Sequence, residues 1–350
     1  MKIHEKYLSR CLQIAKNGLG TTAPNPMVGA VLTLGDRIIG EGFTSPYGGP
    51  HAEVRAIRSV AEPGLLKKAT LYVTLEPCCH YGKTPPCTDL ILEAGIPKVV
   101  IGMPDPHEKV RGKGIEKLRA GGCQVETRVL EDACREHHRR FLCFHEKKRP
   151  YILLKWAQSA DGFIAPDSDL RGPSPEPFWI SGKASRQLVH KWRSEEPAIL
   201  VGTRTALEDN PRLSTRLWTG PSPLRVLIDR NLRVPEHYHL LDGSVKTLVF
   251  YEGEAPAKER KNLLYKRIHP GSDALEQILH CLWEEQVLSV LVEGGAQTLN
   301  SFIASGLWDE ARIIEGPSFL GAGLRAPILS GTLMADWKLE TDLIRILRND

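Results

Sequence analysis

LEPCCHYGKTPPC, residues 75–87, directly follows an apolar run at residues 70–75, and PHAE stands upstream of it at residues 50–53. These stretches supply an imidazole from His51, two thiolates from Cys78 and Cys87, and a carboxylate from Glu53. Three such protein ligands leave one position of a tetrahedral zinc open, which is typical of a catalytic and not of a structural site. Because open α/β sheets place their ligand sites at the ends of strands, the sequence predicts a catalytic zinc centre after a buried strand.

The motif around the cysteines indicates which kind of zinc enzyme this is. Zinc-dependent base deaminases carry H-x-E and P-C-x-x-C, with Glu moving protons and not ligating the metal, so Glu53 is the expected catalytic residue. Here the two thiolates are nine residues apart instead of three. A structural zinc with His80 or Cys79 as fourth ligand, or no metal at all, stays open as an alternative.

Strands and helices alternate along the whole chain, which indicates α/β layers. A basic, polar stretch at 131–149 ends at Pro150, so we expect two domains, 1–147 and 148–350. In the first, the predicted helices are 6–18, 52–60, 88–94 and 114–120, and the strands are 28–34, 37–42, 70–75, 98–102 and 124–128. In the second, the helices are 183–193, 273–285 and 296–305, and the strands are 151–156, 197–202, 224–229, 245–251, 287–292 and 309–315.

Composition limits the partners. The net charge of +4 over 350 residues is too mild to indicate nucleic acid, although an anionic small substrate would fit. No apolar stretch reaches 18 residues, and the first residues lack a signal core, so we expect no membrane span and a cytoplasmic protein. In such a compartment, a close Cys/His cluster indicates a metal more than disulfides.

Three segments carry a resemblance to a known family. Residues 24–29 (PNPMVG), 50–53 and 75–87 closely resemble the deaminase half of the bifunctional deaminase–reductases of riboflavin biosynthesis, and the nine-residue spacing is that family's own form. The resemblance implies a cytidine-deaminase-like, three-layer α/β/α domain with one zinc on His51, Cys78 and Cys87. It also implies substrate contacts from Asn25, Lys83 and Asp105. The sequence departs from the family at Thr44, usually histidine, and at His107, usually asparagine.

The second half adds SADG at 159–162, VGTRT at 201–205 and VEGG at 292–295. The last is a strand–Gly-Gly–helix junction whose backbone N–H groups suit a phosphate, while the absence of G-x-G-x-x-G argues against a standard dinucleotide fold. Together these patches resemble the family's reductase half, which implies a dihydrofolate-reductase-like α/β domain that uses NADPH. By position, the implied cofactor contacts are Ala157, Trp179, Thr205, Asp209, Gly295, Ala296, Gln297, Thr298, Leu299, Asn300 and Ser301, and the implied substrate contacts are Arg193, Leu213, Arg216 and Glu293.

One loop of the second half, residues 165–178, departs from the family. It is longer than usual and holds Pro177 where the family often has a substrate-contacting serine. Ser174 is the candidate replacement, so the rim of the reductase site is the part that the resemblance describes least well.

The resemblance implies two successive reactions on a phosphoribosyl pyrimidine. The first is hydrolytic deamination of 2,5-diamino-6-(5-phosphoribosylamino)pyrimidin-4(3H)-one to 5-amino-6-(5-phosphoribosylamino)uracil. The second is NADPH reduction of the ribosyl to the ribityl chain, in a homo-oligomer (dimer or tetramer). The alternative is a zinc deaminase acting on nucleic acid or a free nucleoside, with a non-catalytic nucleotide-binding second domain. A nucleic-acid deaminase would be expected to carry a C-x-x-C pair and a basic or aromatic stacking surface, and the sequence shows neither.

Overall fold

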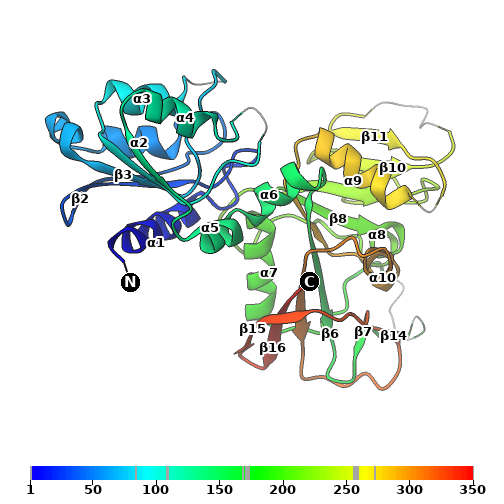
Figure 1. Cartoon of the computed structure of the whole chain (residues 1–350). Coiled ribbons are helices and arrows are strands. Elements are labelled where there is room, and N and C mark those ends of the chain that lie inside the picture. Colours follow the sequence, from blue (N-terminus) through cyan, green and yellow to red (C-terminus); the bar gives the residue numbers. More distant parts are fainter. Residues whose placement is uncertain are drawn as a thin grey trace. The chain divides into compact units, whose positions relative to one another are not determined.

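The computed structural model describes residues 2–82, 85–107, 110–167, 169, 174–254, 260–271 and 273–349. The chain divides into two compact units, Met1–Lys148 and Arg149–Asp350. Each unit has its own sheet and its own helices, labelled in Figure 1.

The sheet of the first unit has, among the described residues, five strands in the order β2-β1-β3-β4-β5. They are β1 (Gly29–Leu34), β2 (Arg37–Phe43), β3 (Thr70–Val73), β4 (Lys98–Ile101) and β5 (Gln124–Thr127). β1 is antiparallel to β2 and β3, while β3, β4 and β5 are parallel. The parallel strands therefore end at one edge, and residues 74–82 leave from that edge.

Helices cover both faces of this sheet (Figure 1). α1 (Ile3–Ala15) packs Tyr7, Leu8 and Cys11 against Val31 and Tyr72 on one face. α2 (Ala52–Arg58), α3 (Cys87–Glu93) and α4 (Lys113–Ala120) cover the other face, and α5 (Glu131–His137) and α6 (Arg139–Glu146) follow β5. This confirms the three-layer α/β/α arrangement expected for the first domain.

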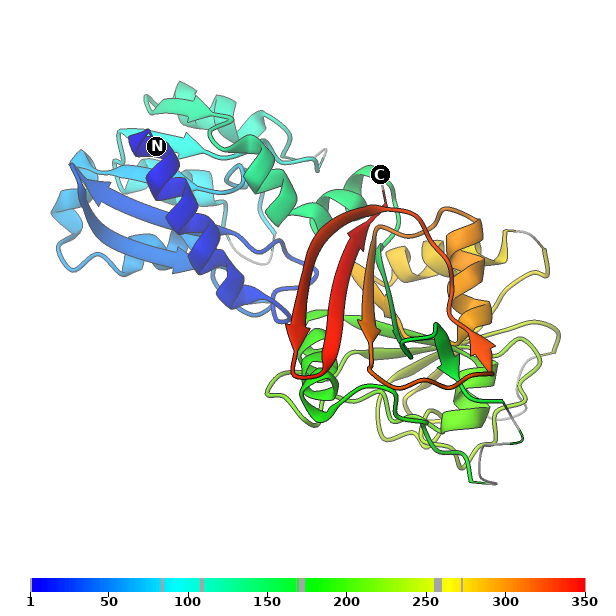
Figure 2. The ribbon, with the colours of Figure 1, turned by 90° about the horizontal axis from the view of Figure 1, so that it is seen from below.

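The second unit is built on a sheet of nine described strands in the order β11-β10-β9-β8-β12-β6-β13-β16-β15. Seven run parallel: β6 (Tyr151–Gln158), β8 (Ala198–Gly202), β9 (Leu224–Ile228), β10 (Thr247–Tyr251), β11 (Leu263–Arg267), β12 (Ser289–Val292) and β13 (Glu310–Glu315). The antiparallel hairpin of β15 (Thr332–Leu339) and β16 (Asp342–Arg348) extends the sheet beyond β13, as Figure 2 shows. A separate short pair joins β7 (Phe163–Ala165) to β14 (Leu324–Arg325).

Apolar side chains of α9 (Ala274–Glu284) and α10 (Ala296–Ala304) form the core over one face of this sheet, with Leu282, Leu299 and Phe302 fully buried. Ile313 belongs to that core, so its neighbour Arg312 points to the opposite face, where it stacks on Trp192 of α7 (Lys183–Glu195). α8 (Thr203–Asp209) follows β8 directly. The expected α/β second domain is confirmed, and β7, α8, β11, β14, β15 and β16 are elements that the sequence did not predict.

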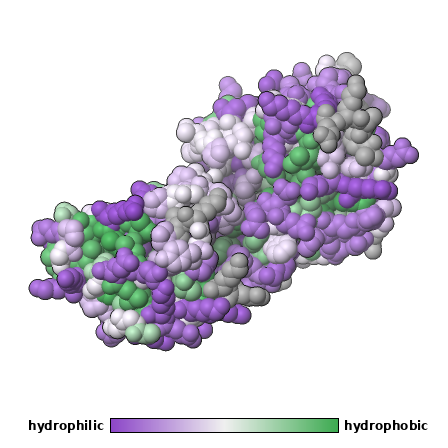
Figure 3. Space-filling view, turned by 90° about the horizontal axis from the view of Figure 1, so that it is seen from above, coloured by the Kyte–Doolittle hydropathy of each residue, from purple (hydrophilic) through white to green (hydrophobic). Residues whose placement is uncertain are grey.

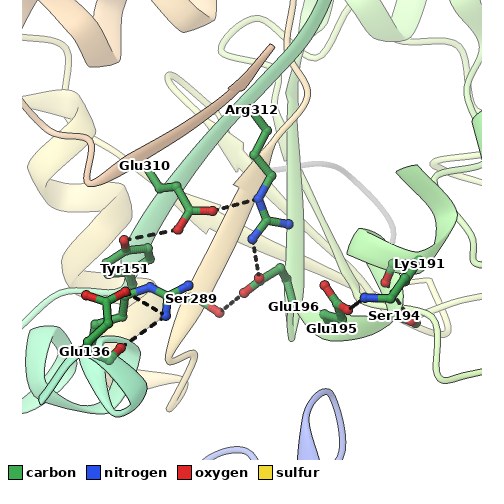
Figure 4. Close-up of polar contacts among 10 residues, drawn as sticks. Glu136, Tyr151, Lys191, Ser194, Glu195, Glu196, Ser289, Glu310 and Arg312 are labelled. Carbon is green, nitrogen blue, oxygen red and sulfur yellow. Dashed lines mark hydrogen bonds and ion pairs between the residues drawn. The ribbon is translucent and has the colours of Figure 1, made fainter. Parts of the chain in front are cut away.

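A network of buried polar side chains lies where the strands of the second unit begin (Figure 4). Arg312 donates from Nε to Glu310 (2.7 Å) and lies 3.7 Å from a carboxylate oxygen of Glu196. Ser289 donates to Glu196 (2.6 Å), and Tyr151 donates to Glu310 (3.4 Å). Tyr151, Ser289 and Glu310 are the first residues of β6, β12 and β13, so the network marks the amino ends of these strands.

No helix among the described residues is long and apolar enough to span a membrane. In Figure 3, polar side chains cover much of the visible surface, with apolar side chains between them.

Candidate active sites

The three expected zinc ligands come together at the carboxyl edge of the first sheet. His51 is the residue before α2, Cys78 lies in the segment after β3, and Cys87 is the first residue of α3. Nδ1 of His51 lies 3.6 Å from Sγ of Cys78 and 3.3 Å from Sγ of Cys87, and the three ligand atoms all lie within 4.8 Å of one another. An imidazole and two thiolates at this separation form a donor set that suits zinc.

The two thiols have unequal acidity. A hydrogen bond from the Cys87 thiol lowers the pKa of Cys78 to about 4, and His51 contributes in the same direction. The same pairing and burial raise the pKa of Cys87 well above its usual value. The backbone N–H of Cys87 also donates to Sγ of Cys78 (3.3 Å), so the start of α3 holds the first thiolate in place. For both sulfurs to bind a metal, the Cys87 thiol must lose its proton as well.

Glu53 lies in the first turn of α2 and is 4% exposed. Burial raises its pKa, and the charge of the neighbouring His51 acts against that rise. A carboxyl group in this position, close to the ligands but outside the ligand cluster, can hold and release a proton at the site.

Neither alternative fourth ligand joins the cluster. Among the described residues, the group that could hold a metal ion contains His51, Cys78 and Cys87, but neither Cys79 nor His80. Burial raises the pKa of Cys79, so its thiol is less acidic than that of Cys78. Three protein ligands leave a coordination position open, which favours a catalytic zinc.

The residues expected to contact the pyrimidine lie on loops around this edge. Asn25 is half-buried in the loop before β1, and Thr44 braces that loop because its hydroxyl accepts the Val28 N–H (3.0 Å). Asp105 is buried in the loop after β4, where burial raises its pKa to about 7, although the His107 N–H that donates to it (2.8 Å) acts against the rise. Lys83 lies outside the described residues.

Sequence reasoning missed one buried carboxylate at this site. Glu76, two residues before Cys78, is 3% exposed and accepts four backbone N–H groups, those of Asp105, Gly112, Gly114 and Ile115. The sequence did offer one sign of Glu76, because an acidic residue directly after an apolar strand is unusual enough to suggest a role. Its partners are 29 to 39 residues away along the chain, so no local pattern reveals them.

The second unit contains a cavity of about 260 Å³ at the carboxyl ends of its parallel strands. Most of the expected contacts line it: Ala157, Trp179, Thr205, Asp209, Arg193, Leu213, Arg216, Glu293 and Gly295. Strand ends are the usual place for ligands in open α/β sheets. This edge is opposite to the buried network of Figure 4, which lies at the amino ends of the same strands.

Buried charges dominate one wall of the cavity. Glu293 receives two hydrogen bonds from Arg193 (2.9 and 2.8 Å) and lies 3.7 Å from Nζ of Lys155. Burial acts to raise the pKa of Glu293, but the charges of Arg193 and Lys155 hold it at about 2. The Glu293 carboxylate therefore pairs with two cations, Arg193 and Lys155. Arg216 adds a third positive charge to the cavity lining. The excess charge suits a phosphorylated ligand.

Lys155 and His190 are further cavity residues that the sequence did not single out. Nδ1 of His190 accepts the Arg216 N–H (3.1 Å), which positions the backbone of Arg216. Burial and the charges of Arg193 and Arg216 lower the pKa of His190 to about 4, so this imidazole is neutral at physiological pH.

The start of α10 reaches the cavity through Gly295, whose N–H donates to Oγ1 of Thr205 (2.7 Å). A Cβ added at Gly294 would lie 2.7 Å from Cβ of Thr298, so glycine is required for this close approach of helix and strand end. The remaining expected contacts of this helix do not line the cavity wall of the described residues: Ala296, Gln297, Thr298, Leu299, Asn300 and Ser301. Leu299 is fully buried in the core, and Gln297, Asn300 and Ser301 are exposed.

At the rim, the cavity wall includes Pro177, Phe178 and Trp179. Trp179 is 53% exposed and stacks on the guanidinium of Arg186, 4.7 Å from the ring centroid. Ser174 is exposed and does not line the described wall, so the structure gives no support to its replacing a serine at Pro177.

Comparisons with known proteins give a family match for each part of the chain. Residues 150–348 match the RibD C-terminal domain, and residues 1–103 match the cytidine and deoxycytidylate deaminase zinc-binding region. The riboflavin biosynthesis protein RibD of Aquifex aeolicus is 40% identical over 327 residues, which cover 92% of this chain and 89% of that protein. RibD of Bacillus amyloliquefaciens is 38% identical over 341 residues, covering 94% and 88%.

Solved structures extend the likeness to the whole chain. The Thermotoga maritima diaminohydroxyphosphoribosylaminopyrimidine deaminase/5-amino-6-(5-phosphoribosylamino)uracil reductase superposes with a TM-score of 0.88 at 36% identity, covering 99% of both chains. RibD of Acinetobacter baumannii gives 0.88 at 33% identity, with the same coverage. These matches confirm the expected family and do not favour a nucleic-acid deaminase. The chain belongs to the RibD family of bifunctional deaminase–reductases of riboflavin biosynthesis.

Proposed function

We propose that residues 1–147 form the zinc-dependent pyrimidine deaminase and residues 148–350 the NADPH-dependent reductase, and that they act in this order. The first would convert 2,5-diamino-6-(5-phosphoribosylamino)pyrimidin-4(3H)-one to 5-amino-6-(5-phosphoribosylamino)uracil. The second would reduce the ribosyl group of that product to a ribityl chain. The observation that carries the proposal is the pairing, in one RibD-family chain, of a three-ligand His/Cys/Cys cluster with a cavity lined by Lys155, Arg193 and Arg216.

In the deaminase, we assign His51, Cys78 and Cys87 as zinc ligands and Glu53 as the catalytic proton carrier. Zinc in such a site supplies a water whose pKa is lowered to about 7. Glu53 would move the two protons of that water in turn, one to the ring nitrogen and one to the leaving amine. Its burial and raised pKa support this role, because a carboxyl group must hold a proton between these two transfers.

Substrate contacts in the deaminase are assigned to Asn25, Lys83 and Asp105. Asn25 and Asp105 lie on loops at the carboxyl edge of the sheet that carries the cluster. Asp105 lies close enough to Cys78 for the thiolate to affect its pKa, which supports a place beside the reacting group.

In the reductase, we assign NADPH to the part of the cavity lined by Ala157, Trp179, Thr205, Asp209 and Gly295. The contacts implied for residues 296–301 of α10 stay a prediction. The bound cofactor supplies the hydride, and the protein binds and orients it. Arg193, Leu213, Arg216 and Glu293 are assigned to the substrate. Because Arg193 already donates from Nε and Nη2 to Glu293, Arg216 is the better phosphate donor of the two.

The finer statements on partners are also proposals. We expect a cytoplasmic homo-oligomer, dimer or tetramer, that acts on a small phosphoribosyl pyrimidine and not on nucleic acid. Light scattering on the purified protein measures the oligomer, and incubation with single-stranded RNA tests the nucleic-acid alternative, for which we expect no ammonia release.

The decisive test of the deaminase assignment is Glu53→Gln. We expect ammonia release from the pyrimidine substrate to fall by about 10²-fold or more, because the proton carrier is lost. Zinc content and NADPH oxidation on the deaminated product should stay at wild-type values. A variant that deaminates at the normal rate would show that Glu53 is not the proton carrier.

A further inference from the structure

Glu76 connects the strand end that carries Cys78 to a loop and a helix far along the chain. Its Oε2 accepts the N–H groups of Asp105 (3.1 Å) and Gly112 (3.0 Å). Its Oε1 accepts those of Gly114 (2.9 Å) and Ile115 (3.2 Å), in the first turn of α4. With 3% exposure, this carboxylate is removed from water, and its backbone N–H also donates to Met103 O (3.0 Å).

Only a carboxylate of this length satisfies the arrangement. An ionised carboxylate offers about four acceptor positions and no donor, and here four N–H groups use them. Glutamine would turn an NH₂ group toward two N–H donors, and aspartate is one methylene too short to reach them. The negative charge also suits the start of α4, where the helix dipole is positive.

The position of α4 depends on a second close contact at the same point. A Cβ added at Gly114 would lie 2.3 Å from the carbonyl oxygen of Pro77, the residue between Glu76 and Cys78. The start of α4 therefore rests directly on the segment that carries the thiolate. Glu76 and Gly114 together hold the Asp105 loop and α4 against the metal-binding corner.

We infer that Glu76 is a positioning residue of the deaminase site, which sets the place of Asp105 relative to the zinc ligands through its four backbone N–H bonds. The inference rests on the proposed role of Asp105 as a substrate contact. It predicts a defect in substrate binding and not in metal binding, because His51, Cys78 and Cys87 make none of these four hydrogen bonds.

The test is steady-state deamination by the full-length zinc enzyme with Glu76→Gln, with Gly114→Ala as a second route to the same displacement. KM for the pyrimidine substrate should rise about tenfold in each, while kcat changes by less than about threefold. Zinc content and NADPH oxidation on the deaminated product should equal those of the wild type. The matched control is Glu41→Gln, because Glu41 is bonded by Arg10 (2.7 and 2.9 Å) in the same unit without touching this loop. It should deaminate normally.

Asp105→Ala separates the inference from the assignment beneath it. It should raise KM by itself, and Glu76→Gln should add little to it, because both changes remove the same contact. A normal KM in Asp105→Ala contradicts the substrate role of Asp105 and the inference together. A normal KM in Glu76→Gln, additive effects in the double variant, or loss of zinc with loss of kcat would each overturn the inference and leave the role of Asp105 standing.

Discussion

At the residue scale, neighbouring cysteines have different environments. Cys78 lies beside His51 and Cys87, which lower its pKa to about 4, whereas burial raises the pKa of Cys79. Among the described residues, Cys78 joins the cluster with His51 and Cys87, and Cys79 does not. The metal cluster therefore uses one of two cysteines that the sequence alone places side by side.

Substitution of these two cysteines tests the ligand assignment. Cys78→Ser should lose zinc and ammonia release, because a thiolate ligand is removed, whereas Cys79→Ser should keep both. Metal analysis of the two purified variants makes the measurement. If Cys79→Ser lost zinc and Cys78→Ser kept it, the zinc ligand would be Cys79 and the assignment of Cys78 would be wrong.

At the element scale, the two ends of the strands in the second unit carry different kinds of polar residue. Lys155 in β6 and Glu293 after β12 line the cavity, where Arg193 of α7 meets them. The amino ends hold Arg312 among carboxylates in a closed, buried network (Figure 4). The first arrangement is built for a ligand, and the second for the packing of β6, β12 and β13.

Replacing Arg312 should therefore affect stability and not catalysis. Arg312→Leu leaves carboxylates buried without this cation, so we expect the second unit to lose about 3 kcal/mol of unfolding free energy. NADPH oxidation by the folded variant should remain normal. Because all seven tryptophans lie in the second unit, tryptophan fluorescence during denaturant unfolding reports on this unit alone.

Arg345→Leu is the matched control for this change. Arg345 also pairs with a carboxylate, Glu315 at 2.9 Å, but its side chain is 39% exposed, so the loss should stay below about 1 kcal/mol. Equal losses in the two variants would show that burial does not set the contribution of Arg312.

At the scale of the whole molecule, each unit contains its own site. The expected zinc ligands and Glu53 all lie before Lys148, and the described residues that line the cavity all lie after Arg149. The metal-binding cluster and the cavity thus use separate sets of residues.

Removal of the metal should therefore separate the two activities. After treatment with a zinc chelator, ammonia release should disappear, while NADPH oxidation on the deaminated product should stay within about twofold of normal. Added zinc should restore deamination. Loss of both activities on chelation would show that the reductase depends on the metal.

The elements predicted from sequence were those with a local pattern. β1, β3, α7 and α10 have apolar periodicity or clear end signals, and the structure places them within a few residues of expectation. The β15–β16 hairpin was missed because its turn has no Gly, Pro or Asn, and Glu340 takes the positive φ of +55° instead. β15 is almost wholly exposed in the structure.

The sequence by itself determined the metal chemistry of the first unit, because the donor types and the spacing of His51, Glu53, Cys78 and Cys87 lie in two short segments. Glu293 was also expected, from the resemblance, but its partner Lys155 was not. Only the tertiary structure decided which side chains support these groups. Glu76 with the Asp105 loop, and Lys155 with Glu293, join residues 29 to 138 positions apart. Such contacts depend on how the strands order themselves in a sheet, which no local pattern records.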